Sequence, residues 1–275
     1  MNVGENLILK QGKNEIVFKI EKILGEGAGC SVYYVRYKEN DKYVHSGVLK
    51  EFNPKDKDID LEKYKKKFLK SYELQLKFRS LYDEKMNITS NAEGIYEGNN
   101  TFYILMSCDN GVSYNEVKDE SLKDILKTSL AITKALGVYH KNGYLHLDIK
   151  PSNVLVIPET KELVKLFDFD SVVKKDELEN TRLSYSPNWS APELIDKGKH
   201  YLIGEATDIY SIGAIVFNKI FKKYPMSKDR RAFSRYDYNK EDKLFKNMSP
   251  KIFKLLTNFF HKTLQVTVKN RYKNT

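Results

Sequence analysis

The stretch YLHLDIKPSNVLV, residues 144–156, places an aspartate, a lysine and an asparagine inside an otherwise apolar run. Asp148, Lys150 and Asn153 lie between two strand-like segments, and Pro151 rules out a continuous helix across them. Such a loop is either an ordinary solvated connection or a set of positioned catalytic groups. The rest of the sequence decides between these two interpretations.

Length and composition indicate a folded protein with one large domain or two lobes. The 275 residues are 41% hydrophobic and 12% aromatic, which excludes a wholly disordered chain. No apolar run approaches the roughly 20 residues that span a bilayer, and the first residues lack a signal-peptide pattern. Cys30 and Cys108 are too few for a disulfide framework. We therefore expect a cytoplasmic protein with no membrane partner.

The formal charge of +10 comes from 47 basic and 37 acidic residues. The two signs are interleaved, as in PKDKDIDLEKYKKKFLK at residues 54–70. Interleaving favours a solvated basic surface, or a preference for acidic substrates and phosphate, over a polyanionic partner. We expect no nucleic-acid partner.

The first hundred residues predict strands, and the residues from about 121 onward predict helices. Strands are expected at 14–24, 31–39, 45–52 and 100–108. A helix capped by Asp60 precedes the last of them, with one apolar face at helical spacing formed by Leu61, Tyr64, Phe68, Tyr72 and Leu76. Further helices are expected at 121–143, 206–221 and 250–264. We predict an α+β chain with a β-rich lobe at 1–108, an α-helical lobe at 109–275, and a ligand cleft between them.

Two features of the first lobe suggest a phosphate ligand. The loop LGEGAGCSVYYV carries Gly25, Gly27 and Gly29, and glycines let backbone N–H groups approach a phosphate closely, although any tight turn also needs them. Lys50 lies in an apolar strand, where burial requires an anion, and Glu73 on the following helix is a suitable partner. Both side chains would face water if these positions were surface positions.

The second lobe carries a candidate metal site. Asp148 and Asn153 are five positions apart, and the run LVKLFDFDSV adds Asp168 at the end of another apolar strand. Carboxylate and amide oxygens are ligands that Mg²⁺ prefers, and Lys150 beside them would neutralise a phosphate in transfer. Each of these residues taken alone is more often a plain loop residue.

Taken together and in this order, the features resemble the eukaryotic-like protein kinase family. The likeness rests on a glycine-rich turn, a strand lysine, a helix glutamate, HLDIKPSN, DFD, SAPE, DIYSIG and a late arginine, and it covers about residues 18–271. It implies a bilobal protein-kinase-like fold and ATP-dependent transfer of the γ-phosphoryl group to a serine or threonine hydroxyl of a protein, with ATP and Mg²⁺ as cofactors.

The resemblance also implies a role for each matching residue. Lys50 would contact the ATP phosphates and pair with Glu73, and Asp148 would accept the proton of the substrate hydroxyl. Lys150 would assist transfer, and the metal ligands would be Asn153 and Asp168. Nucleotide contacts would come from Gly25, Gly27, Gly29, Val32, Met106 as gatekeeper, and the hinge at 107–109 that includes Cys108.

Four more residues match structural supports of the family. Ser186 corresponds to the hydroxyl that contacts the catalytic aspartate and lysine, and it favours serine/threonine specificity. Glu193 and Arg271 match a buried ion pair of the helical lobe, and Asp208 matches the helix aspartate that braces the catalytic loop.

Three positions depart from the family pattern. Cys30 stands where the third loop glycine is usual, which the site tolerates. Leu147 replaces the arginine that docks a phosphorylated activation segment, so we expect no dependence on that switch. Asp170 replaces the glycine after the metal-ligating aspartate and its phenylalanine, which restricts the backbone there.

Two alternatives stay open. A pseudokinase that binds nucleotide or a protein without turnover is favoured by Asp170 and Leu147, but the retained catalytic residues count against it. A small-molecule kinase of related fold would have a similar Asp and Asn loop, but the SAPE segment and Lys150 count against it.

Overall fold

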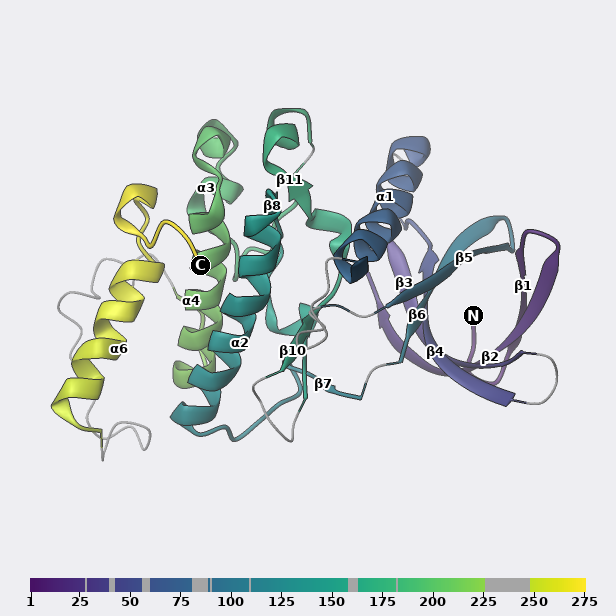
Figure 1. Cartoon of the computed structure of the whole chain (residues 1–275), viewed down its shortest axis with the longest axis horizontal. Coiled ribbons are helices and arrows are strands. Elements are labelled where there is room, and N and C mark those ends of the chain that lie inside the picture. Colours follow the sequence, from purple (N-terminus) through teal and green to yellow (C-terminus); the bar gives the residue numbers. More distant parts are fainter. Residues whose placement is uncertain are drawn as a thin grey trace. The chain divides into compact units, whose positions relative to one another are not determined.

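The computed structural model of the chain describes residues 1–27, 29–39, 43–55, 60–80, 89, 91–108, 110–157, 163–181, 183–225 and 248–275. It divides into two units, Met1–Asn110 and Gly111–Thr275, which are described separately below (Figure 1). Within the described residues, no helix combines the length and the apolar composition that crossing a bilayer requires.

The first unit consists of a closed antiparallel sheet and one helix. The strands run in the order β1-β2-β3-β4-β6-β5 around the sheet. Their bounds are β1 (Asn6–Gln11), β2 (Asn14–Glu26), β3 (Cys30–Glu39), β4 (Tyr43–Phe52), β5 (Ala92–Gly98) and β6 (Thr101–Ser107), with α1 (Leu61–Ser80) between β4 and β5. The four expected strands are all present, whereas β1 and β5 were not predicted.

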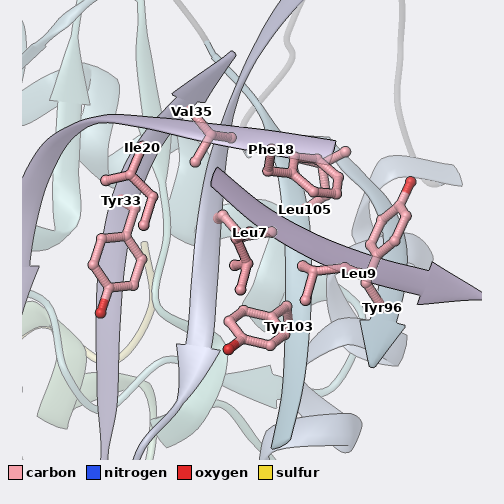
Figure 2. Packing of buried hydrophobic residues seen from close by; sticks show 10 residues of the cluster. Leu7, Leu9, Phe18, Ile20, Tyr33, Val35, Tyr96, Tyr103 and Leu105 are labelled. Atoms are coloured by element: carbon pink, nitrogen blue, oxygen red, sulfur yellow. The ribbon is translucent and has the colours of Figure 1, made fainter. Parts of the chain in front are cut away.

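Alternating side chains of these strands form the core of the first unit (Figure 2). Phe18 and Ile20 of β2 are fully buried, and Lys19 between them is exposed, as expected of a half-buried strand. Full burial of each such apolar side chain stabilises the fold by about 1.5–3 kcal/mol. The cluster contains Leu7, Leu9, Phe18, Ile20, Tyr33, Val35, Leu49, Tyr96, Tyr103 and Leu105.

Helix α1 begins where the sequence predicts. The Asp60 carboxylate accepts a hydrogen bond of 3.1 Å from the Lys63 amide, which satisfies one of the free N–H groups of the first turn. The packed face of the helix differs from the predicted one. The buried residues are Phe68, Ser71, Leu74, Gln75 and Phe78, and Leu61 and Leu76, which were expected on the packed face, are exposed.

The second unit is mainly helical, with short strands around the polar loop. Its helices are α2 (Leu122–Lys141), α3 (Pro192–Ile195), α4 (Glu205–Phe221) and α6 (Pro250–Thr263). Its strands are β7 (Val112–Ser113), β8 (Tyr144–Leu145), β9 (Val154–Val156), β10 (Val164–Leu166) and β11 (Val173–Lys174). Its 3₁₀ turns are η1 (Pro151–Asn153), η2 (Phe169–Ser171), η3 (Lys175–Asn180), η4 (Lys197–Leu202) and η5 (Val268–Asn270).

Helices α2 and α4 pack against each other and carry the catalytic loop's supports (Figure 1). The Ser121 hydroxyl caps α2 by accepting from the Asp124 amide at 3.2 Å, and the chain turns away at Gly143, whose φ is 80°. Helix α4 is buried along nearly its whole length, and a Cβ on Gly213 would lie 2.3 Å from the Thr263 hydroxyl oxygen. Only glycine therefore permits the observed approach of α4 and α6.

Candidate active site

The carboxylate of Asp148 is held by three side chains in the loop that follows β8. Its Oδ1 accepts from the Ser186 hydroxyl at 2.7 Å, and its Oδ2 accepts from Lys150 Nζ at 2.8 Å and from Asn153 Nδ2 at 3.0 Å. A second bond of 2.9 Å joins Asn153 Nδ2 to the Asp148 carbonyl. The Asp148 side chain is only 12% exposed, so a poised acceptor is fixed in one orientation close to solvent.

Ser186 links the segment before α3 to this loop. Its hydroxyl donates to Asp148 and accepts a 3.2 Å bond from Lys150 Nζ, and its amide donates to the Ser190 hydroxyl at 2.9 Å. The family resemblance predicted that Ser186 contacts Asp148 and Lys150, and the structure shows both contacts.

Asn153 and Asp168 lie at neighbouring ends of two paired strands. Strand β9 pairs with β10 antiparallel, with Val154 opposite Leu166, so the residues flanking this pair are adjacent. The Phe167 amide also donates to the Asn153 carbonyl at 3.1 Å. Asp168 follows directly with φ 67° and ψ 74°, a left-handed conformation that is uncommon for a residue other than glycine and is often associated with functional sites.

The donor set of these two residues fits a divalent cation bound together with a phosphate ligand. Both side-chain hydrogen bonds that Asn153 makes here use its Nδ2 donor, so its amide oxygen is the atom suited to a metal. No group of three or more His, Cys, Asp or Glu side chains forms a metal cluster anywhere in the described part of the chain. An Asn–Asp pair would therefore need further oxygens, which nucleotide phosphates and water supply in such sites.

Asp208 of α4 accepts hydrogen bonds from the backbone just before Asp148. Its carboxylate accepts from the amides of His146 at 2.9 Å and Leu147 at 2.8 Å, and it lies 2.9 Å from Nε2 of His140. These bonds hold Leu147 at φ 62°. Burial opposes ionisation of Asp208, but the hydrogen bond and charge of His140 outweigh it and lower the pKa of the carboxyl.

His146 lies in a buried aromatic group beneath the loop. Its ring centroid is 5.6 Å from that of Tyr139 and 6.5 Å from that of Phe169, the residue after Asp168. Burial lowers the pKa of His146, although nearby carboxylates oppose the shift, and neither ring nitrogen has a hydrogen-bond partner among the described residues. A neutral imidazole thus serves as a packing group. This aromatic group was not predicted from the sequence. The available signal is position alone: His146 is two residues before Asp148, and Phe169 directly follows Asp168.

In the first unit, the glycine-rich segment forms the turn between β2 and β3. Gly25 lies opposite Val32 in the sheet, and the Gly27 amide donates to the Cys30 carbonyl at 2.8 Å. A Cβ on Gly29 would lie 3.1 Å from the Tyr64 ring of α1, so a side chain there would press against that ring.

Lys50 lies on β4, between Val32 of β3 and Ile104 of β6. It is 9% exposed, and its Nζ lies 5.9 Å from the centroid of the Phe68 ring of α1. Met106 of β6 is half-buried opposite Val48, and Cys108 is exposed. Residue 109, the last of the expected hinge, lies outside the described residues.

Glu73 occupies the solvent side of α1. It is exposed, whereas Ser71 and Gln75, two positions before and after it, are 5% and 4% exposed. Residues two apart on a helix point about 200° apart, so the side of α1 that packs in the unit carries a serine and an amide rather than this carboxylate. Glu73 therefore lies on the exposed side of α1, which does not favour the expected ion pair with Lys50.

A buried ion pair joins α3 to the turn after α6. Arg271 Nη1 and Nη2 donate to the two carboxylate oxygens of Glu193 at 2.6 and 2.8 Å. Its Nε donates to the Gln265 carbonyl at 2.6 Å, and the Thr207 hydroxyl donates to Glu193 at 2.9 Å. Every one of these charged groups is therefore hydrogen-bonded, as buried charges must be.

The structure thus brings Asp148, Lys150, Asn153 and Ser186 into direct contact in the second unit and places Asp168 beside them in the strand pair. In the first unit it places Lys50 opposite Val32, next to the glycine turn. The chemistry that such groups support is transfer of a phosphoryl group to a hydroxyl.

Comparisons with known proteins agree with this geometry. The protein kinase domain family matches residues 18–273. Over 219 residues the chain is 30% identical to an Aurora kinase of Debaryomyces hansenii, which covers 76% of this chain and 48% of that protein. Smooth-muscle myosin light chain kinase of Gallus gallus is 24% identical over 206 residues, covering 73% of this chain and 10% of its own length. A probable serine/threonine-protein kinase, fhkC, of Dictyostelium discoideum is 25% identical over 219 residues, covering 76% and 34%.

The chain spans from a tenth to about half of the length of these curated relatives. The family match, by contrast, extends over nearly the whole chain and includes the catalytic loop, the DFD segment and the Glu193–Arg271 pair. The chain belongs to the protein kinase domain family.

Proposed function

We propose that this chain is an ATP-dependent protein serine/threonine kinase that transfers the γ-phosphoryl group to a protein hydroxyl. The observation that carries the proposal is the Asp148 carboxylate, held at 2.7–3.0 Å by Ser186, Lys150 and Asn153 and still open to solvent. A carboxylate fixed in this way is suited to accept the proton of an incoming hydroxyl.

Each neighbour of Asp148 has a distinct part in this mechanism. Asp148 would orient the substrate hydroxyl and take its proton as the hydroxyl oxygen bonds to the γ-phosphorus, while the bond from that phosphorus to the β,γ-bridging oxygen breaks and ADP leaves. Lys150, 24% exposed, would provide positive charge beside the transferring group. Ser186 would hold the Asp148 and Lys150 side chains in place through its two hydrogen bonds. Asn153 and Asp168 would hold Mg²⁺, which supplies charge neutralisation to the phosphates when it is bound with ATP.

The first unit is proposed as the nucleotide lobe and the second as the substrate lobe. Gly25, Gly27, Gly29 and Val32 would cover the phosphates and base, Lys50 would contact the phosphates, and Met106 and Cys108 would flank the adenine. Two cysteines are too few for a disulfide framework, which supports the cytoplasmic location proposed for the chain.

The proposal is tested by phosphate transfer from labelled ATP with Mg²⁺ to a generic basic protein, for the wild type and for Asp148→Asn. We expect incorporation into serine or threonine and a loss of roughly 10²–10⁴-fold in the variant, because general-base catalysis contributes about that factor. Thermal stabilisation by nucleotide should persist in the variant, since Asp148 is not proposed to hold ATP. Equal incorporation by both proteins would contradict the assignment.

A second candidate function is nucleotide binding without turnover, and α1 is the observation that favours it. The packed face of α1 carries Ser71 in a buried position, and Glu73 is exposed. If the exposed Glu73 takes no part in aligning the ATP phosphates, ATP would raise the melting temperature without any phosphate transfer, and Asp148→Asn would change nothing.

A further inference from the structure

A polar pocket of about 350 Å³ opens in the second unit beside the catalytic loop. Its walls come from three segments that are far apart in the sequence: residues 115–119 after β7, Pro151 in η1, and the end of α4 at residues 218–222. Three lysines, Lys118, Lys219 and Lys222, line it, against a single acidic residue, Asp119. The mechanism proposed above uses none of these side chains.

Lys219 forms the fixed floor of this pocket. It is 6% exposed, and its Nζ donates to the carbonyls of Tyr114 at 2.7 Å and Val117 at 2.8 Å. The same Nζ lies 3.0 Å from a carboxylate oxygen of Glu120 and 3.9 Å from the centroid of the Tyr114 ring. Lys219 therefore anchors residues 114–120 to α4, and its charge is balanced by Glu120.

Lys118 and Lys222 are the charges that remain for a ligand. Both are exposed, and neither forms an ion pair with any residue that the structure describes. Lys222 is also held in place by its backbone, because it ends α4 at φ 55° with its amide bonded to the Asn218 carbonyl at 2.8 Å. Lys118 and Lys222 against Asp119 leave an excess of positive charge at this pocket.

The pocket lies close to the reacting groups of the same unit. Pro151 is the third residue after Asp148, and consecutive Cα atoms are about 3.8 Å apart, so their Cα atoms are within roughly 11 Å. An extended peptide advances about 3.3 Å per residue. A substrate whose hydroxyl reaches Asp148 could thus place a side chain about two to four residues away in this pocket.

We propose that this pocket is a substrate-specificity subsite that binds an anionic side chain, a carboxylate or a phosphate, near the phosphoacceptor. The inference rests on the proposed kinase function and names the substrate class of that same site. Lys118 and Lys222 would pair with the anion, and the Asn218 side chain at the rim adds a neutral polar group. The negative charge of Asp119 would repel the anionic side chain and so reduce the preference for acidic over neutral substrates.

The test uses one serine peptide with Asp, phosphoserine, Ala or Lys placed in turn at each position within four residues of the acceptor. For each peptide, kcat/KM is measured, and fluorescence anisotropy gives the Kd of a labelled copy independently of turnover. The proteins are the wild type, Lys118→Glu with Lys222→Glu, Asp119→Asn, and a control Lys254→Glu. Lys254 is an exposed lysine of α6 in the same unit, so the control makes the same kind of charge change outside the pocket.

We expect the wild type to prefer an acidic residue over Ala at one or two positions by roughly two- to fivefold, since an exposed ion pair changes an equilibrium constant by up to about fivefold. The double variant should instead prefer Lys at the same positions, Asp119→Asn should increase the acidic preference, and Lys254→Glu should keep it. Comparing Asp with phosphoserine peptides identifies which anion the subsite takes.

Two results would overturn the inference. One is an equal response to all peptides in the wild type, and the other is the same loss of preference in Lys254→Glu as in the double variant, which would indicate diffuse surface charge. Failure to phosphorylate any peptide would count against the proposed kinase function alone, because the anisotropy series still compares anionic with neutral peptides at the pocket.

Discussion

Asp208 shows how a single buried carboxylate positions the catalytic loop without contacting a substrate. It is fully buried, and its two oxygens accept from consecutive backbone amides, those of His146 and Leu147, that directly precede Asp148. Leu147 can keep its left-handed φ of 62° because both amides have a charged acceptor. We therefore regard Asp208 as a positioning residue.

Replacing Asp208 with Asn should destabilise the second unit. An amide has one acceptor oxygen, so one backbone N–H would lose a charge-assisted bond, and such bonds contribute about 1.5–3 kcal/mol each. We expect the free energy of unfolding in urea to fall by about 1.5–3 kcal/mol on that basis. Glu179→Gln, an exposed change in η3, is the matched control and should stay within about 0.5 kcal/mol.

The same pair of proteins should differ in pH dependence. Because the folded-state pKa of Asp208 is lowered, its contribution to stability is fully present above the ordinary aspartate pKa of about 4 and is lost as pH falls toward the folded value. The stability difference between wild type and Asp208→Asn should therefore shrink below about pH 4. A difference that stays constant through that range in denaturant titrations would contradict the assigned shift.

At the residue scale, the sequence predicted both the catalytic loop and its supports Ser186 and Asp208, but not the backbone conformation of the loop. A spacing of two and five positions put Lys150 and Asn153 within reach of Asp148, and the structure shows both contacts. The left-handed backbone of Leu147 could not be predicted, because a leucine gives no sign of a positive φ. A long-range hydrogen bond from its amide to the Asp208 carboxylate accompanies this conformation.

At the scale of elements, α1 shows where periodicity fails. The sequence predicted Leu61, Tyr64, Phe68, Tyr72 and Leu76 as one packed face, but the structure buries Ser71 and Gln75 and exposes Leu61 and Leu76. Polar residues on the packed face shift the apparent phase of an apolar pattern. The choice of Glu73 came from the order of motifs and not from this pattern, and the structure places Glu73 at an exposed position.

The phase of α1 leads to a prediction about nucleotide binding. Ser71→Glu would place a carboxylate on the face that also carries Phe68, whose ring lies 5.9 Å from Lys50 Nζ. We expect it to tighten ATP binding by roughly two- to tenfold, since a partly buried ion pair is worth up to about 1–1.5 kcal/mol. Glu73→Ala should change the Kd, measured by titration calorimetry, less than twofold. A tenfold loss of affinity in Glu73→Ala would contradict the observed helix phase.

The segment between β11 and α3 is held by apolar packing. Leu178 and Leu183 pack against a buried cluster of Leu145, Leu147, Val173, Leu194 and Ile203, so Leu147 contributes contacts where the family has a charged residue. This packing agrees with the expectation drawn from Leu147, which stays a prediction.

Activity should accordingly be independent of phosphorylation of this segment. Phosphatase treatment, or Thr181→Ala with Ser184→Ala, should leave kcat/KM within about twofold, because neither side chain belongs to the apolar cluster. Leu178→Ala with Leu183→Ala should accelerate limited proteolysis within residues 175–190, since the segment loses its apolar contacts. Leu163→Ala, at a 46% exposed position, is the control. Inactivation by phosphatase would argue for an ordering role of phosphate.

At the scale of the whole molecule, sequence position is a poor guide to what lies together. The pocket walls at 115–119, 151 and 218–222 meet only through the packing of the second unit, and no local pattern marks them as a set. From the sequence alone, the excess of basic residues had two interpretations: a solvated basic surface, or a preference for acidic substrates and phosphate. The fold shows where some of that excess gathers.

The Glu193–Arg271 pair should dominate the stability of the second unit. Arg271→Met leaves a buried carboxylate without its cation, and breaking such a pair costs about 3–5 kcal/mol. The double variant with Glu193→Met should recover part of that loss in urea unfolding, because it also removes the unpaired charge. If the double variant lost as much as the sum of the two single variants, the two residues would not be coupled.

This pair also has a consequence for biosynthesis. The two residues are 78 positions apart, and ribosomes add about 5–20 residues per second, so Glu193 emerges roughly 4–16 s before its cation is made. During that interval the nascent second unit cannot bury α3 without stranding a negative charge. Final closure of this unit therefore waits for a residue translated near its end, and a chain interrupted before Arg271 would present an unfinished core to chaperones.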